Sequence, residues 1–194
     1  KFPMNENHRV LAQSPYAASK IAADNLALSY SNSYGLPVKI IRPFNAFGPR
    51  QSNRAIIPSV ISQILSNKNY IKVGNINPRR DWTYVTDLCE AYYNLFKSNK
   101  GFGNVYNVGT GIDYSIKEMI NISKKICKTK KKLIFEFKRK RPKGSEVTRL
   151  LCDHKIFKKE TGWKPKINFH KGLNETINWI KKDLVNRSPE KYQI

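Results

Sequence analysis

The stretch Ser14-Pro-Tyr-Ala-Ala-Ser-Lys20 opens a long helix-forming segment near the start of the chain. Pro15 stands where the first turn of a helix tolerates proline. Tyr16 and Lys20 are four residues apart, so a helix places them on one face. A lysine ammonium beside a phenol favours the phenolate, which then serves as a base near neutral pH. The same spacing is common on purely structural helices, so the pair alone leaves a catalytic and a structural role open.

The residues that follow predict a parallel strand beside this helix. The segment Gly35-Leu-Pro37 is predicted to end the helix. The helix carries apolar and small residues on more than one face, which predicts that it packs on two sides, with room for a partner subunit. Residues 38–42 are rich in β-branched side chains, which predicts a buried strand. Residues 43–49 are predicted to form the turn that leaves it. Because ligands bind beyond the carboxyl ends of parallel strands, Asn45 is placed to offer its amide to a ligand.

The rest of the chain alternates helices and strands, which predicts an α/β fold. Thr86-Asp87 is predicted to cap one helix, and Ser115 with Glu118 forms a predicted capping box for another. Further helices are predicted at residues 56–65, 88–97, 116–127, 155–161 and 169–184. Further strands are predicted at residues 70–73, 78–85, 102–108 and 133–137.

Composition narrows the function classes. The formal net charge is +22, which suits an anionic partner, but lysine is used throughout and most lysines are expected to be solvated. Nucleic-acid binding therefore stays a minor alternative, without zinc-finger spacing or an RNA-binding aromatic motif. The three cysteines and three histidines fit neither a disulfide framework nor a metal pattern, and the cysteines predict a reducing cytoplasm. No apolar run approaches the roughly 18–20 residues of a membrane span.

Five motifs in order resemble the extended short-chain dehydrogenase/reductases, the NAD-dependent nucleotide-sugar epimerases and dehydratases. The resemblance covers nearly the whole chain. The motifs are Tyr16-x-x-x-Lys20, Arg42-Pro-Phe-Asn-Ala-Phe-Gly-Pro49, Arg80-Asp-Trp-Thr-Tyr-Val-x-Asp87, Tyr106-Asn-Val-Gly-Thr-Gly111 and Gly162-Trp-x-Pro165. The fold implied is the C-terminal part of a Rossmann-type extended fold. Residues 1–50 would be a remnant of the NAD-binding domain, and residues 51–194 mainly the substrate-binding lobe, with some segments returning to the Rossmann sheet.

The resemblance also implies roles for individual residues. Tyr16 would be the catalytic tyrosine, and Lys20 would bind the nicotinamide ribose and assist Tyr16. Pro43 and Phe44 would lie against the nicotinamide. The implied contacts to the nucleotide sugar are Asn45, Ala55, Ile56, Arg80, Trp82, Arg141 and Glu146.

Three of these residues also have a simpler explanation. Arg80 would pair with its neighbour Asp81, and Arg141 would be one more cation of a basic loop. Trp82 would be a core residue, nearly as good an explanation as ligand contact. The segment from Tyr106 to Gly111 is expected to be structural.

Within this superfamily the chain looks most like UDP-N-acetylglucosamine 4,6-dehydratases, and it is also similar to dTDP-glucose and GDP-mannose 4,6-dehydratases. The alternatives are a nucleotide-sugar 4-epimerase and a non-catalytic nucleotide-sugar-binding protein. A homodimer through the Tyr16–Lys20 helix is expected. The chain departs from the family in three respects: it has no glycine-rich dinucleotide motif, no Ser or Thr of the kind expected upstream of Tyr16, and none of the acidic residues expected there. We therefore expect a fragment that binds NAD poorly and does not turn over alone.

Overall fold

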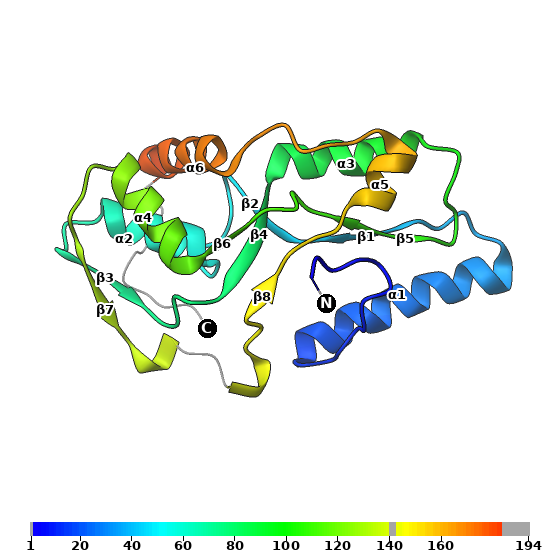
Figure 1. The fold of residues 1–194 in the computed structure, drawn as a ribbon, viewed down its shortest axis with the longest axis horizontal. Coiled ribbons are helices and arrows are strands. Elements are labelled where there is room, and N and C mark those ends of the chain that lie inside the picture. The colour runs from blue at the N-terminus through cyan, green and yellow to red at the C-terminus, as the bar shows by residue number, and fades with distance from the viewer. Residues whose placement is uncertain (1, 140–142, 184–194) are drawn as a thin grey trace.

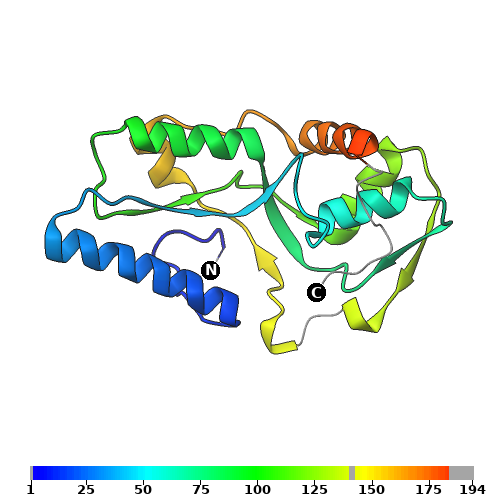
Figure 2. The same ribbon diagram turned by 180° about the vertical axis from the view of Figure 1, so that it is seen from behind.

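The computed structural model describes residues 2–139 and 143–183, and it has two halves joined by a central set of strands (Figure 1). In one half, β1 (Ile40–Pro43) and β5 (Val105–Val108) pair in parallel. Helix α1 (Pro15–Tyr34) lies on one side of this pair, and α3 (Val85–Lys97) and α5 (Lys155–Thr161) lie on the other (Figures 1 and 2). The predicted α/β class is confirmed.

The other half packs three helices over a second parallel pair. This pair joins β3 (Tyr70–Val73) to β7 (Lys132–Phe135). The helices are α2 (Ile56–Leu65), α4 (Ile116–Ile126) and α6 (Phe169–Asp183). Short 3-10 turns η1 (Phe137–Arg139) and η2 (Lys143–Ser145) follow β7.

The central strands connect the two halves. Strand β4 (Arg79–Tyr84) pairs in parallel with β2 (Asn45–Phe47) and β8 (Arg149–Leu150), and antiparallel with β6 (Asp113–Ser115). Strand β2 is a correction, because residues 43–49 were predicted to be a turn. A strand of three residues forms there because β4 pairs with it in parallel, with Asn45 opposite Trp82.

A second correction concerns the start of α3. Asp87 is not a cap: the helix begins at Val85, and Tyr84 at the cap position makes no side-chain cap hydrogen bond. The Asp87 carboxylate is buried and accepts from the backbone amides of Lys166 and Ile167, at 3.1 and 2.9 Å. It therefore ties α3 to the segment that precedes α6. The capping box of Ser115 and Glu118 at α4 is confirmed.

Helix α1 contacts the body with one stripe of half-buried residues, and Arg42 of β1 reaches this stripe through an ion pair with Asp24, 2.7 Å between Nε and Oδ2. No described residue of α1 is buried. Its opposite stripe carries exposed Leu26, Tyr30 and Tyr34. The predicted packing of its second side therefore stays a prediction.

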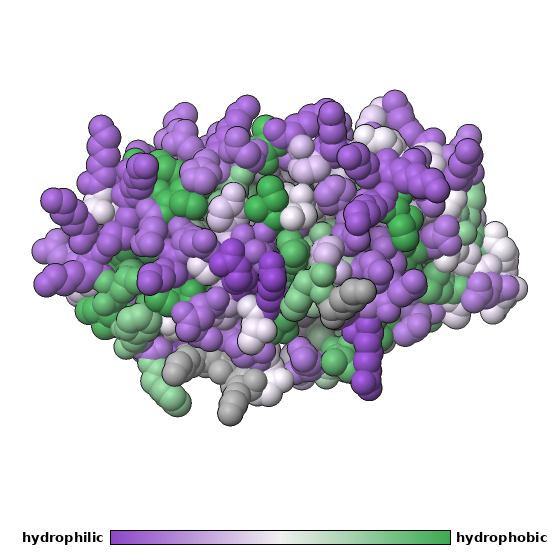
Figure 3. Space-filling view, viewed as in Figure 1, coloured by the Kyte–Doolittle hydropathy of each residue, from purple (hydrophilic) through white to green (hydrophobic). Residues whose placement is uncertain are grey.

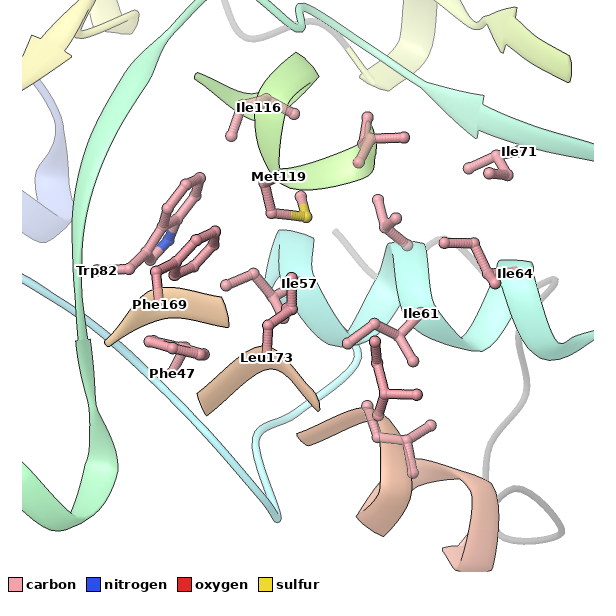
Figure 4. Packing of buried hydrophobic residues seen from close by; sticks show 14 of the residues in the cluster. Phe47, Ile57, Ile61, Ile64, Ile71, Trp82, Ile116, Met119, Phe169 and Leu173 are labelled. Carbon is pink, nitrogen blue, oxygen red and sulfur yellow. The ribbon is translucent and has the colours of Figure 1, made fainter. Parts of the chain in front are cut away.

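The larger hydrophobic core lies in the half that carries α2, α4 and α6 (Figure 4). Phe169 at the start of α6 joins an aromatic group at one side of this core: the Trp82 ring stacks on it at 5.1 Å between centroids, and Phe47 meets it edge-on. This packing fixes β2 and β4 against α6. A smaller core around Tyr106, Phe157 and Trp163 lies between β5, α3 and α5.

Hydrophilic side chains cover most of the face in Figure 3, interrupted by separate hydrophobic patches. Within the described residues, none of the helices has the length and apolar character needed to cross a membrane.

Candidate functional site

A cavity of about 310 Å³ lies where β2, β3, β4 and the start of α2 meet. Six of the predicted site residues line it: Asn45, Ala55, Ile56, Arg80, Trp82 and Glu146. The structure thus brings together residues from four separate segments of chain. Their roles stay predictions, because no ligand contact tests them.

Arg80 and Glu146 form one side of the cavity. Arg80 Nη2 lies 3.6 Å from Glu146 Oε1 in an ion pair, and both side chains are largely buried, 11% and 17% exposed. Arg80 also donates from Nη1 to the backbone oxygen of Arg79 at 2.8 Å. These contacts hold the guanidinium at the cavity wall, and a planar guanidinium is a group that suits an anionic ligand.

The simpler explanation for Arg80, an ion pair with Asp81, is wrong. Asp81 points away from the cavity and is fully buried. Its carboxylate accepts from the backbone amides of Thr110, Gly111 and Cys152, at 2.8, 2.8 and 3.1 Å. The segment around Thr110 is thus structural, as predicted.

Asn45 and Trp82 lie opposite each other on β2 and β4. The Asn45 Oδ1 atom is buried and has no hydrogen-bond partner within the described part of the chain. An unpartnered buried acceptor is costly, so a ligand hydroxyl or amide would satisfy it. Trp82 is a core residue stacked on Phe169 and also lines the cavity, and its contact with a ligand stays a prediction.

Sequence reasoning missed the wall formed by Lys72 and Arg139. Glu136 holds both, with Lys72 Nζ at 2.9 Å from Oε1 and Arg139 Nε at 2.6 Å from Oε2. The hydrogen bond from Lys72 has the largest effect on the pKa of Glu136, followed by the hydrogen bond from Arg139, and these bonds lower that pKa to about 2. Lys72 and Glu136 are 64 positions apart, and only the parallel pairing of β3 with β7 brings them together.

The cavity lining is strongly basic. Its ionisable residues are the cations Arg54, Lys72, Arg80 and Arg139 and one carboxylate, Glu146. With Glu136, which pairs with Lys72 and Arg139, the four cations face two carboxylates, and the remaining excess of positive charge favours an anionic ligand.

The predicted catalytic pair lies outside the lining of this cavity. Tyr16 is in the first turn of α1, and its side chain is 72% exposed. Lys20 Nζ lies 5.6 Å from the centre of the Tyr16 ring, so the predicted shared face is confirmed. Pro43 ends β1, and the next amide, that of Phe44, donates to Val108 O at 2.8 Å. Arg141 lies outside the described residues.

Comparison with known proteins identifies a family for the chain. Residues 1–176 match the family model described as GDP-mannose 4,6 dehydratase. The chain is 32% identical over 182 residues to GDP-6-deoxy-D-mannose reductase of Pseudomonas aeruginosa, covering 91% of this chain and 59% of the relative. It is 31% identical over 177 residues to dTDP-D-glucose 4,6-dehydratase of Homo sapiens, covering 89% of this chain and 49% of the relative.

A solved structure gives the same result for the fold. The dTDP-glucose 4,6-dehydratase of Bacillus anthracis, in complex with NAD, superposes with a TM-score of 0.84 at 30% identity. The match covers 93% of this chain and 56% of that structure. The chain therefore spans about half the length of the curated relatives it matches.

Proposed function

Because the chain belongs to the GDP-mannose 4,6-dehydratase family, we propose that its cavity binds the nucleoside diphosphate of a nucleotide sugar. The observation that supports this most directly is the cavity lining of four cations and one carboxylate. A diphosphate carries at least two negative charges, and arginine offers a planar fork that matches phosphate oxygens.

In this proposal the residues of the cavity divide the nucleotide between them. Arg80 donates to the diphosphate, and the Asn45 amide binds beside it. Glu146 accepts from ribose hydroxyls. Ala55 and Ile56, at the start of α2, contact the nucleotide.

NAD is the proposed cofactor, and the residues near α1 fit it in part. The exposed Tyr16 ring and the Lys20 ammonium on the same face are open to a bound nicotinamide ribose. Tyr16 would hold the proton of the sugar hydroxyl at Oη, and Lys20 would bind the ribose. When bound, NAD would accept the hydride from the sugar.

The reaction we propose is that of a 4,6-dehydratase, with UDP-N-acetylglucosamine as the favoured substrate. The sugar is oxidised at C4, loses water across C5–C6 and receives the hydride at C6. A 4-epimerase would use the same Tyr16–Lys20 pair. Product analysis with UDP-N-acetylglucosamine, dTDP-glucose and GDP-mannose distinguishes the two, since only a dehydratase releases a 4-keto-6-deoxy sugar. We place the protein in the cytoplasm, which suits its free thiols.

Calorimetric titration of this chain with UDP, dTDP and GDP tests nucleotide binding. Arg80→Ala is expected to weaken binding of the preferred nucleotide by about tenfold or more, because it removes a charge-assisted contact. Arg9→Ala, at an exposed arginine that does not line the cavity, is the matched control. Equal affinities of the Arg80→Ala and unmodified proteins would contradict the assignment.

Two further measurements test the cofactor. This chain alone is expected to bind NAD poorly, because its sequence has no glycine-rich phosphate-binding motif; micromolar binding in calorimetry would contradict this. In a protein that contains this chain and turns over, Tyr16→Phe is expected to abolish hydride transfer and leave nucleotide binding intact. Unchanged turnover would show that another base acts.

A further inference from the structure

The inference concerns how the Glu146 carboxylate is held at the cavity, and it rests on the proposed nucleotide-binding function. We propose that Asp113 is a positioning residue for the nucleotide site, although it does not line the cavity. It fixes β8 against β4 from the opposite face of the sheet, and Glu146 lies directly before β8. The ion pair of Arg80 with Glu146 therefore depends on a carboxylate that lies outside the site.

The pairing of the central strands places Asp113 on the face away from the cavity. Strand β6 pairs antiparallel with β4, with Tyr114 opposite Arg80 and Asp113 opposite Asp81. Because successive side chains of a strand point to opposite faces, Asp113 and the cavity-lining Arg80 lie on different faces. Strand β8 pairs with Arg79 and Arg80 as β6 does, so these two strands flank β4 on its two edges.

The Asp113 carboxylate connects all three strands. Arg79 Nε of β4 donates to Oδ1 at 3.0 Å, and Arg149 Nε of β8 donates to Oδ2. Arg79 Nη2 also donates to the backbone oxygen of Asp113 at 3.0 Å. The Asp113 side chain is only 6% exposed, and hydrogen bonds between a carboxylate and guanidinium groups are among the strongest in proteins. One carboxylate thus ties β8 across β4 to β6.

Strand β8 depends on this link because its backbone pairing is short. It consists of Arg149 and Leu150, which pair with Arg79 and Arg80. A backbone hydrogen bond of 2.8 Å from the Arg79 amide to the Thr148 oxygen adds to this pairing. Two paired residues hold a strand weakly, so the side-chain link through Asp113 contributes much of what keeps β8 in register.

Glu146 lies three residues before Arg149 and turns toward the cavity, which it lines. Its Oε1 atom is 3.6 Å from Arg80 Nη2, which is longer than a hydrogen bond. Such a pair responds to small movements of the segment that carries it. A binding group that moves by about 1 Å loses much of its contribution, so a shift of β8 is expected to weaken ligand binding.

Removal of the Asp113 charge is not expected to unfold the protein. The Arg79 and Arg149 side chains are 38% and 40% exposed, so water can solvate both guanidinium groups when the carboxylate is gone. Arg79 also keeps its ion pair with Glu118, 2.9 Å between Nη1 and Oε2. Asp113→Asn therefore tests the position of β8 in a folded protein.

Calorimetric titration of this chain, with whichever of UDP, dTDP and GDP binds most tightly, tests the inference. Asp113→Asn is expected to weaken binding about fivefold or more, because a neutral amide holds the two arginines less firmly. The matched control is Glu118→Gln, which removes the other ion pair of Arg79 and keeps the capping box. It should leave the affinity unchanged, since the Glu118 ion pair with Arg79 does not involve β8.

Two other outcomes separate this inference from the proposed function. Equal affinities of Asp113→Asn and the control would overturn the inference and leave the proposed nucleotide binding standing. An unmodified chain that binds none of the three nucleotides would overturn both.

A double-mutant cycle tests whether Asp113 acts through Glu146. Glu146→Gln alone is expected to weaken binding, and Asp113→Asn added to it should then weaken binding by less than about twofold. A merely structural role would give the same further loss with or without the Glu146 carboxylate, and that result would overturn the inference. Arg149→Gln breaks the same link from β8 and provides the test if Asp113→Asn does not fold; an unchanged affinity of this variant would overturn the inference as well.

Discussion

Asp81 shows how one buried carboxylate supports the strand that carries the site. Besides three backbone amides, it accepts from the Thr110 hydroxyl at 2.6 Å. Burial raises the pKa of Asp81, and these hydrogen bonds oppose that shift. Asp81 stands between Arg80 and Trp82 in the chain. It links β4, which carries both of them, to the turn after β5 and to the segment after β8.

Replacing Asp81 with alanine should therefore destabilise the fold strongly. The change leaves three backbone amides and the Thr110 hydroxyl without this buried acceptor, and we expect the free energy of unfolding to fall by roughly 3 kcal/mol or more in urea denaturation. Glu90→Gln, which removes a partly exposed ion pair with Lys166, should cost less than about 1 kcal/mol. Similar losses for the two variants would show that the Asp81 contacts are dispensable.

Glu136 gives a prediction about pH. Its pKa is lowered from the ordinary 4.5 to about 2 by Lys72 and Arg139. Its contribution to stability is therefore present above about pH 4.5 and is lost as the pH falls toward 2. Glu136→Gln should be less stable than the unmodified protein at pH 7, and the difference should shrink across this window in urea denaturation at several pH values. A difference that stays constant from pH 7 to pH 2 would contradict the assignment.

At the scale of the element, the capping box at the start of α4 is the feature most open to test. The Ser115 hydroxyl accepts from the Glu118 amide at 3.1 Å, and the Glu118 carboxylate accepts from the Ser115 amide at 2.6 Å. Ser115→Ala should lower the free energy of unfolding by about 1 kcal/mol, measured by urea denaturation. Ser29→Ala in the middle of α1 is the control, and it should be neutral or slightly stabilising. An equally neutral Ser115→Ala would show that the cap is not needed.

The capping box and β2 show what the sequence can and cannot predict about elements. Ser115 and Glu118 are three residues apart, so their contact follows from local sequence. Residues 43–49 contain prolines and a glycine and indicate a turn, and only the distant partner β4 makes part of them a strand. Local sequence likewise predicts a cap at Asp87, because the amides that its carboxylate accepts from are 79 and 80 positions away.

The cavity-lining residues also fall into two groups, those that the sequence can predict and those that it cannot. Asn45, Arg80 and Trp82 could be predicted because they lie in motifs that resemble a family. Lys72 and Arg139 could not, since neither lies in such a motif and Arg139 belongs to a basic run that is typical of solvated surface. Their place at the cavity depends on the pairing of β3 with β7 and on Gly74, where a Cβ atom would clash with the Arg139 carbonyl group.

At the scale of the whole molecule, the exposed stripe of α1 is the surface we propose for self-association. Leu26, Tyr30 and Tyr34 are 62%, 48% and 74% exposed, although apolar and aromatic side chains of this size favour burial. A second copy that packs the same stripe would bury these three side chains through a symmetric interface.

The division of the chain into residues 1–50 and residues 51–194 stays a prediction.

Leu26→Arg tests this surface. A charge in a packed apolar interface should weaken self-association by about tenfold or more in sedimentation equilibrium. Asn32→Arg, on a different face of the same helix, is the matched control and should leave the association constant unchanged. An unmodified protein that is monomeric at high micromolar concentration would rule out the dimer.

The stacking of Trp82 on Phe169 has a spectroscopic consequence. Trp82 borders the cavity, whereas Trp163 is buried in the smaller core and donates from Nε1 to the backbone oxygen of Asp87. A nucleotide entering the cavity would change the surroundings of Trp82 and leave those of Trp163 and Trp179, which do not line it, unaltered. The molecule thus contains its own fluorescent reporter, and occupancy of the site could be followed from tryptophan emission without any added label.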